Sequence, residues 1–290
     1  MKIFLPLCFI LLVLFSSCSS TPRRPAENLE QRNNAANLLN NANRAANQGR
    51  YDEAFIFLNE ARRIALSTDD PALRIETSMS RANILFSMGH NDEAFREWEH
   101  AALEAELSGE DEMAALSRVY SIRASLTLLG NSDPVNLNEA QNHRNTLLTL
   151  NPAFRRNTHS QAALFVSLAL AEKLLGNWTG AEEYARNALV IHERGNFLEN
   201  AAYDWFLIAS IRSLSGNYNT ALEALQRSIE FDRRAENSFG LASSWQAMGD
   251  VYNKAGRRSE ANAACQRAAE IFRAISLLER AERLEERINE

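Results

Sequence analysis

The chain has 290 residues, of which 46% are hydrophobic and 23% are charged, a balance that allows a continuous buried core and is typical of folded proteins. Its net charge is −6, and acidic and basic residues are interspersed, which excludes the basic surface that nucleic-acid binding requires. With 11 glycines and 6 prolines, and with Ala, Leu, Glu, Arg and Asn abundant, the composition predicts helices. The three cysteines, Cys8, Cys18 and Cys265, have no spacing that suits a disulfide framework or a metal site.

Residues 1–17 have the features of a bacterial export signal. Lys2 supplies a positive charge, and an apolar run of thirteen residues follows, which is too short to span a bilayer comfortably. The run is followed by Ser16-Ser17-Cys18, and small residues before a cysteine resemble the bacterial lipobox. This resemblance implies that the signal is removed after residue 17, that Cys18 is acylated, and that fatty acids such as palmitate anchor the protein to a membrane.

The lipobox usually has Leu three residues before its cysteine, and Phe15 stands there instead. Spirochaetal lipoboxes tolerate this change, so the resemblance extends to a spirochaetal lipoprotein; the alternative is an ordinary signal peptide cut near Ser17 or Ser20. Two or more acyl chains on Cys18 would anchor the protein stably, whereas one chain binds a membrane marginally. Residues 18–27 are polar and contain two prolines, so we expect a short extended tether there.

The rest of the chain repeats. Six glycines recur at intervals of 40, 41, 46, 40 and 40 residues, and small residues lie at fixed offsets from most of them. Because small residues let helices approach closely and glycine permits a tight turn, each unit is predicted to be two helices joined by a turn. The glycines are Gly49, Gly89, Gly130, Gly176, Gly216 and Gly256. The packing columns are Ala54, Ala94, Ala181, Ala221, Ala261; Ala61, Ala101, Ala188, Ser228, Ala268; and Ala42, Ala82, Ala169, Ala209, Gly249.

This pattern resembles the tetratricopeptide repeat, most clearly at Trp245, Met248-Gly249, Tyr252 and Ala261. The resemblance covers about residues 30–275 and implies an all-α solenoid of about six repeats, stacked as a right-handed superhelix with first helices on the concave side. The common period is about 34 residues, so the helices here should be longer, and HEAT-like repeats with a period near 40 are the alternative fold. We assign residues 28–275 to the repeat domain and residues 276–290 to a C-terminal capping helix.

No catalytic or cofactor motif is found along the chain. The sequence has no phosphate-binding glycine loop, no dinucleotide pattern and no paired-histidine zinc motif, and its histidines are scattered over different units. His100 and Glu104 could share a helix face, but no third metal ligand is in view. Cys265 occupies a packing column, which favours a core thiol over a nucleophile. We therefore predict a protein that is not an enzyme and uses no cofactor or metal.

In tetratricopeptide folds the concave wall binds peptides or helices, and the resemblance implies where that wall lies here. Offsets from each turn glycine select the predicted groove residues Met79, Phe86, Tyr120, Val166, Leu170, Tyr203 and Phe206. The alternative is that the longer helices bury these side chains in the core. The carboxylate clamp of co-chaperones is not reproduced, so we do not expect recognition of an acidic chain terminus.

These features together predict a membrane-anchored scaffold or adaptor in a cell-envelope complex. Its partner would be a protein or peptide held in the groove, its soluble domain would lie in the periplasm, and the membrane could be the inner or the outer one. The alternative function is an accessory lipoprotein of a solute-uptake system, which docks a ligand-binding protein or holds a small apolar ligand. A hydrophobic tunnel would favour that alternative, and an open groove would favour the adaptor.

Overall fold

The computed structural model describes residues 30–154 and 158–289, so the predicted export signal, Cys18 and the tether lie outside the described residues. The chain divides into residues 1–30 and residues 31–290, and the helical array belongs to the second unit. The predicted all-α fold is confirmed over the described residues, which form helices and contain no strand. The helices are α1 (Glu30–Asn47), α2 (Tyr51–Ser67), α3 (Pro71–Ser87), α4 (Asn91–Ser108), α5 (Asp111–Gly130), α6 (Leu137–Leu150), the 3-10 helix η1 (Asn151–Phe154), α7 (Thr158–Leu174), α8 (Trp178–Arg194), α9 (Leu198–Leu214), α10 (Tyr218–Ala235), α11 (Ser238–Lys254), α12 (Arg258–Ala274) and α13 (Leu278–Asn289).

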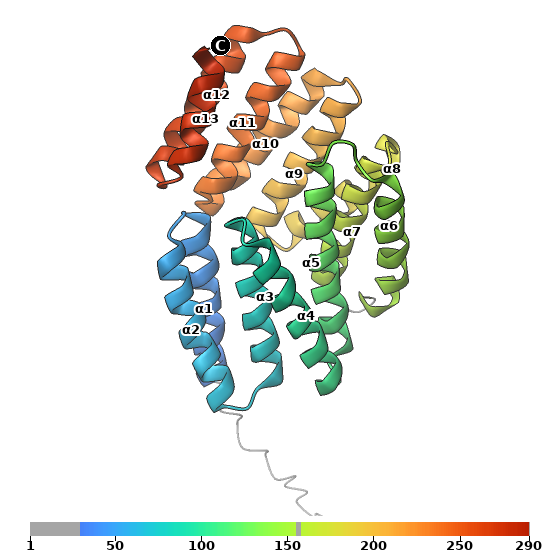
Figure 1. The fold of residues 1–290 in the computed structure, drawn as a ribbon, viewed down its shortest axis with the longest axis vertical. Helices are drawn as coiled ribbons and strands as arrows, with labels where there is room; N and C mark the ends of the chain where they lie inside the picture. The colour runs from blue at the N-terminus through green and yellow to red at the C-terminus, as the bar shows by residue number, and fades with distance from the viewer. Residues whose placement is uncertain (1–29, 155–157, 290) are drawn as a thin grey trace, which may run out of the picture. The chain divides into compact units, whose positions relative to one another are not determined.

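The helices pair as hairpins that follow one another in chain order (Figure 1). Five of the six predicted turn glycines separate the two helices of a hairpin with φ between 74° and 85°, a conformation that costs glycine little. Gly130 differs, because it is the last residue of α5 and residues 131–136 make the connection to α6. The third hairpin is therefore irregular, in agreement with the longer interval of 46 residues between Gly130 and Gly176.

The predicted packing columns are buried. The five alanines of the first column have no exposed surface, and the members of the second column are at most 1% exposed. Cys265 is a buried free cysteine, as expected of a core residue. It also explains why the third column has Gly249 in place of alanine, because a Cβ added there would lie 2.5 Å from the Cys265 sulfur. Small side chains thus set the distance between stacked helices.

The C-terminal helix α13 packs on α12 through Ala281 and Leu284, which are 0% and 3% exposed. Leu278, which the sequence places on the same apolar stripe, is instead 53% exposed, because it starts the helix at the edge of this contact. No helix in the described ranges combines the length and the apolar character that crossing a bilayer requires.

The turn of the first hairpin contacts the connection before α13. A Cβ built on Gly49 would lie 2.6 Å from the carbonyl oxygen of Ile275, so the backbones approach closely there. Arg280 of α13 is near enough to Tyr51 of α2 for their charges to interact. The first and last hairpins of the 31–290 unit are therefore neighbours, and both contribute to the cavity described next.

Candidate functional site

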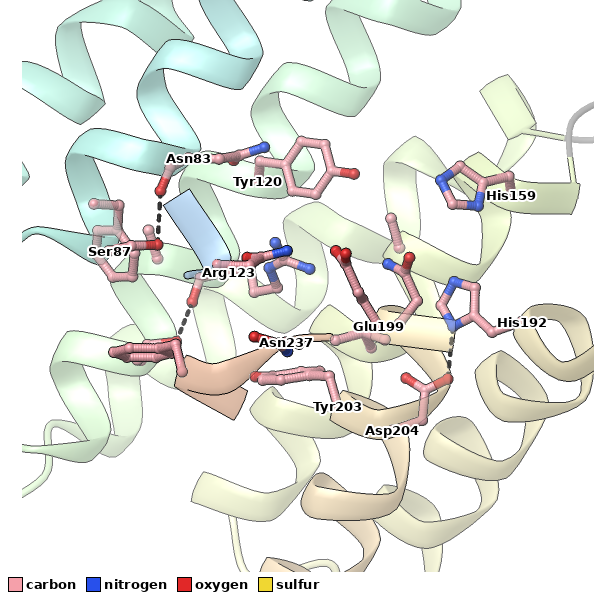
Figure 2. Close-up of a pocket in the computed structure, with 18 of the residues that line it drawn as sticks. Asn83, Ser87, Tyr120, Arg123, His159, His192, Glu199, Tyr203, Asp204 and Asn237 are labelled. Atoms are coloured by element: carbon pink, nitrogen blue, oxygen red, sulfur yellow. Dashed lines mark hydrogen bonds and ion pairs between the residues drawn. The ribbon is translucent and has the colours of Figure 1, made fainter. Parts of the chain in front are cut away.

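A cavity of about 490 Å³ is lined mainly by the first helices of the hairpins, and α13 contributes Arg280. Its volume falls within the range of sites for small ligands or a few peptide residues. Polar and charged side chains line much of the cavity, together with aromatic groups such as Phe86 of α3 and Phe239 of α11. Figure 2 shows Tyr120 and Arg123 on one side of it and His192 and Asp204 on the other.

A buried histidine–aspartate pair joins α8 to α9 at the cavity wall. Nδ1 of His192 and Oδ2 of Asp204 are 2.6 Å apart, and the two side chains are 2% and 0% exposed (Figure 2). Burial raises the pKa of Asp204 to about 6, against the hydrogen bond from His192, which lowers it. The pair therefore places a titratable carboxylate in a nearly dry part of the wall.

His159 of α7 extends this cluster. Its ring centroid is 5.6 Å from that of His192 and 4.4 Å from that of Phe197. Burial lowers the pKa of His159, and the neighbouring His192 lowers it further. Among the described residues, no group of three or more histidines, cysteines or acids is arranged to hold a metal ion.

Two buried polar atoms at the cavity wall have no hydrogen-bond partner within the described part of the chain. They are the donor Nε1 of Trp98 and the acceptor Oδ1 of Asp204. A buried polar group without a partner destabilises a folded protein, so such atoms are uncommon. These two atoms mark places where a bound molecule would supply the missing hydrogen bonds.

Two arginines line the cavity without a carboxylate within ion-pair distance among the described residues, and each instead lies over an aromatic ring. The Cζ atom of Arg123 is 4.7 Å from the centroid of the Tyr120 ring. That of Arg280 is 4.9 Å from the centroid of the Phe239 ring, and burial lowers the pKa of Arg280. The aromatic rings position both guanidinium groups but leave their N–H donors available.

Amide and carboxyl groups complete the wall. Asn83 of α3 and Asn200 of α9 line the cavity, and neither side chain makes a hydrogen bond within the described ranges. Burial raises the pKa of Glu199, and the neighbouring Asn47 and Arg44 side chains lower it. The wall therefore offers donors and acceptors from several hairpins, an arrangement that suits noncovalent binding of a polar ligand.

The predicted groove residues fall into two groups. Phe86, Tyr120, Val166 and Tyr203 line the cavity. Phe206 does not line it, and its ring stacks on Tyr203 with centroids 6.3 Å apart. Met79 and Leu170 also do not line it: they are 7% and 5% exposed and pack into hydrophobic clusters, so the expectation that they face a groove is wrong. The helices approach more closely there than the offsets alone indicate.

The sequence reasoning missed His192 and Asp204, although the repeat contains a signal for them. Forty residues later the same two positions hold Asp232 and Ser244, and these also contact each other, with 3.3 Å between Ser244 Oγ and Asp232 Oδ2. Twelve residues before the turn glycine, the position of Asp204 holds the buried Thr77 in the second hairpin but the buried Leu164 in the fourth. The signal in the spacing is therefore limited to this pair of polar positions, which recurs forty residues later.

Arg123 and Arg280 were missed for a different reason. Counting back seven residues from Gly130 places Arg123 in a column of small residues, which shows that the third hairpin does not keep the register. Arg280 lies on the charged face of the C-terminal helix, which looks like ordinary solvent-exposed surface in sequence. The structure brings both side chains to the same cavity.

Comparison with known families identifies the hairpins of the C-terminal part of the array. Two family models of the tetratricopeptide repeat match the chain, one over residues 162–195 and the other over residues 197–274. Helices α7 to α12 form tetratricopeptide repeats. A comparison with curated protein sequences finds no match.

Several solved structures share this fold. A signal transduction ATPase of Pyrococcus horikoshii with a tetratricopeptide repeat sensor has a TM-score of 0.58 at 14% identity, over 86% of this chain and 37% of that one. The Cut9–Hcn1 hetero-tetramer of the APC/C gives 0.53 at 17% identity, over 87% and 47% of the two chains. Aspartyl phosphate phosphatase F of Bacillus subtilis gives 0.50 at 11% identity, over 90% and 70%. At these identities the likeness establishes the fold alone.

Proposed function

We propose that this protein is a non-catalytic scaffold that binds a protein or peptide partner in the cavity of its tetratricopeptide array. The observation that supports this most is the composition of the cavity wall, which gathers polar and aromatic side chains from all six hairpins and α13. Peptide ligands present both backbone polar groups and side chains, so a wall with both kinds of contact suits them. One similar structure, Cut9–Hcn1, is by its name an assembly of two different proteins.

The chemistry of the wall also argues against the small apolar ligand that the solute-uptake alternative includes. A small apolar ligand would need a dry apolar tunnel, because burying unpaired polar groups against it has an energetic cost. The cavity instead includes Arg123, Glu199, Asp204 and Arg280. These groups favour a partner that supplies charges and hydrogen bonds.

The partner test compares two double variants of the full chain in capture experiments from the host. Tyr120→Ala with Tyr203→Ala removes two aromatic groups from the cavity wall. Leu103→Ala with Leu107→Ala is the control, because these side chains lie outside the cavity and are 55% and 81% exposed. Truncating a binding hot spot typically weakens binding by about 2 kcal/mol or more, which is roughly thirtyfold.

We expect the cavity variant to lose the partner that the wild type captures, and the leucine variant to keep it. Circular dichroism of both variants checks that they remain folded. If the leucine variant loses the partner and the folded cavity variant keeps it, the binding surface is the outer one and the proposal is wrong.

We further propose that acylated Cys18 anchors the protein to a membrane of the cell envelope, with the array on the periplasmic side. The support is the short apolar run followed by Ser16-Ser17-Cys18. The test is expression of the full chain in bacteria supplied with a labelled fatty acid. Wild type should incorporate the label and Cys18→Ser should not. Equal labelling of the two would contradict the lipoprotein proposal without bearing on the cavity.

A further inference from the structure

Six arginines of the described chain are partly or mostly shielded from solvent, and they divide by their partners. Four of them form an ion pair with a glutamate: Arg74 with Glu104, Arg81 with Glu97, Arg144 with Glu172 and Arg212 with Glu182. The other two, Arg123 and Arg280, have no carboxylate within 4 Å in the described ranges, and both line the cavity. An arginine shielded from water without an anion is unfavourable, so this coincidence indicates an anionic ligand.

The unpaired polar atoms of the cavity wall indicate which chemical groups the ligand carries. Nε1 of Trp98 is a buried donor without a partner in the described chain, so it also calls for an acceptor such as a carboxylate oxygen. Oδ1 of Asp204 is a buried acceptor without a partner there, and it calls for an N–H or O–H group. A molecule that carries carboxylates next to N–H donors satisfies both demands, and a peptide with acidic side chains is such a molecule.

We propose that the cavity binds its partner through an acidic peptide segment, whose side-chain carboxylates pair with Arg123 and Arg280 and whose backbone N–H donates to Asp204. This inference rests on the proposed function, because it names the chemistry of the partner. It concerns side-chain carboxylates, since the chain lacks the co-chaperone residues that recognise an acidic terminus.

The acids of the wall select a carboxylate over a phosphate. Glu199 and Asp204 line the same cavity as the two arginines. A phosphate group carries nearly two negative charges at neutral pH and would be repelled by these acids more strongly than a carboxylate. A basic peptide is disfavoured because Arg123 and Arg280, which have no carboxylate within ion-pair distance in the described ranges, would repel it.

The test uses fluorescein-labelled octapeptides with both ends blocked, titrated with the full chain in mild detergent and followed by fluorescence anisotropy. A positional-scanning library is made in four matched panels that place Glu, Gln, phosphoserine or Lys at each position. We expect the Glu panel to bind at least tenfold more tightly than the Gln and Lys panels. Arg123→Met and Arg280→Met should each reduce this preference severalfold. The control Arg258→Met, at an exposed arginine outside the cavity, should leave it unchanged.

Several results would overturn the inference. They are equal binding of the Glu and Gln panels, a preference for phosphoserine or Lys, a Glu preference that survives both arginine changes, and no peptide binding at all. Competition by free N-acetylglutamate at the concentration of the peptide would show that the ligand is a small acid and not a peptide segment. Circular dichroism checks that each variant is folded, and Arg→Gln replaces any Arg→Met variant that is not.

The two proposals can fail separately. If the Tyr120 and Tyr203 double variant loses the native partner but the arginine variants show no change in peptide preference, the scaffold function stands and the acidic segment is wrong. If the double variant keeps the partner, the cavity is not the binding surface, and both proposals fail.

Discussion

The packing columns and the cavity wall are built from the same hairpins on opposite principles. Each column repeats small residues at one offset, as Ala181, Ala221 and Ala261 do, and its members are buried. The cavity wall keeps its positions but not its residue types: Ala163 is followed forty residues later by Tyr203, and Glu199 by Phe239. Stacking imposes the same demand on every hairpin, whereas a ligand meets each hairpin with a different part of its surface. Regularity in this chain therefore marks stability, and departures from it mark the candidate site.

The contact between the first and last hairpins gives the largest expected effect. Gly49 has φ of 75° and a Cβ there would lie 2.6 Å from the Ile275 carbonyl oxygen, whereas Gly216 has φ of 83° and open space around it. Gly216→Ala should cost about 1–2 kcal/mol through its backbone conformation alone. Gly49→Ala should cost roughly 3 kcal/mol, because the clash adds to that strain. Urea unfolding measures both changes, and equal losses would show that the two ends of the array are not in contact.

Overpacking a column should have the next largest effect. Ala221 has no exposed surface and Ala263 is exposed on α12. Ala221→Leu should lower the free energy of unfolding by about 1–3 kcal/mol, because the helices have no space for a larger side chain. Ala263→Leu should change it by less than about 0.5 kcal/mol. A neutral effect at Ala221, measured by urea unfolding, would mean that the column does not hold the hairpins together.

The buried carboxylate of Asp232 makes stability depend on pH. Its pKa is raised to about 7, mainly by burial, from an unfolded value of 3.8. The folded chain therefore binds the proton of the Asp232 carboxyl group more tightly than the unfolded chain does. The resulting stabilisation is complete below about pH 4 and is lost as the pH rises towards 7. When the pH is raised from 4.5 to 8, the free energy of unfolding of Asp232→Asn should increase relative to that of wild type by on the order of 2 kcal/mol.

Thermal unfolding at both pH values measures this gain. The matched control is Glu223→Gln, at an exposed acid of the same helix, α10. Its difference from wild type should stay nearly constant over this pH range, since water surrounds that side chain in both states. If the difference in unfolding free energy between Asp232→Asn and wild type is the same at both pH values, burial does not raise the pKa of this carboxylate.

Replacing an arginine should have the smallest effects on stability, and these effects should differ between an arginine in an ion pair and an arginine of the cavity wall. Arg144 Nε lies 2.6 Å from Glu172, whose side chain is 5% exposed, so Arg144→Met leaves a buried carboxylate without its counter-ion. We expect a loss of about 1–2 kcal/mol, below that of a fully buried pair because Arg144 is partly exposed. Arg123→Met breaks no ion pair and should change stability by less than about 0.5 kcal/mol. Equal losses in urea unfolding would show that Arg123 has a structural partner within the protein.

The hairpins, their turns and the packing columns can be derived from the amino-acid sequence alone. A 40-residue period with Gly at the turn and Ala at fixed offsets leaves little freedom, because only small side chains fit where helices touch. It also placed Cys265 in the core and identified the irregular third hairpin. Local spacing carries these features, so they can be derived without knowing how distant hairpins meet.

The cavity was decided by the tertiary structure. Asn47, Arg123, Asp204 and Arg280 are far apart in sequence and line one cavity because the hairpins stack and the first and last turns meet at Gly49. The same stacking buried Met79, which the offsets had placed in the groove. Whether a side chain on a helix face becomes wall, core or surface depends on the distance and angle to the next hairpin. A pattern of residues along one helix does not contain that information.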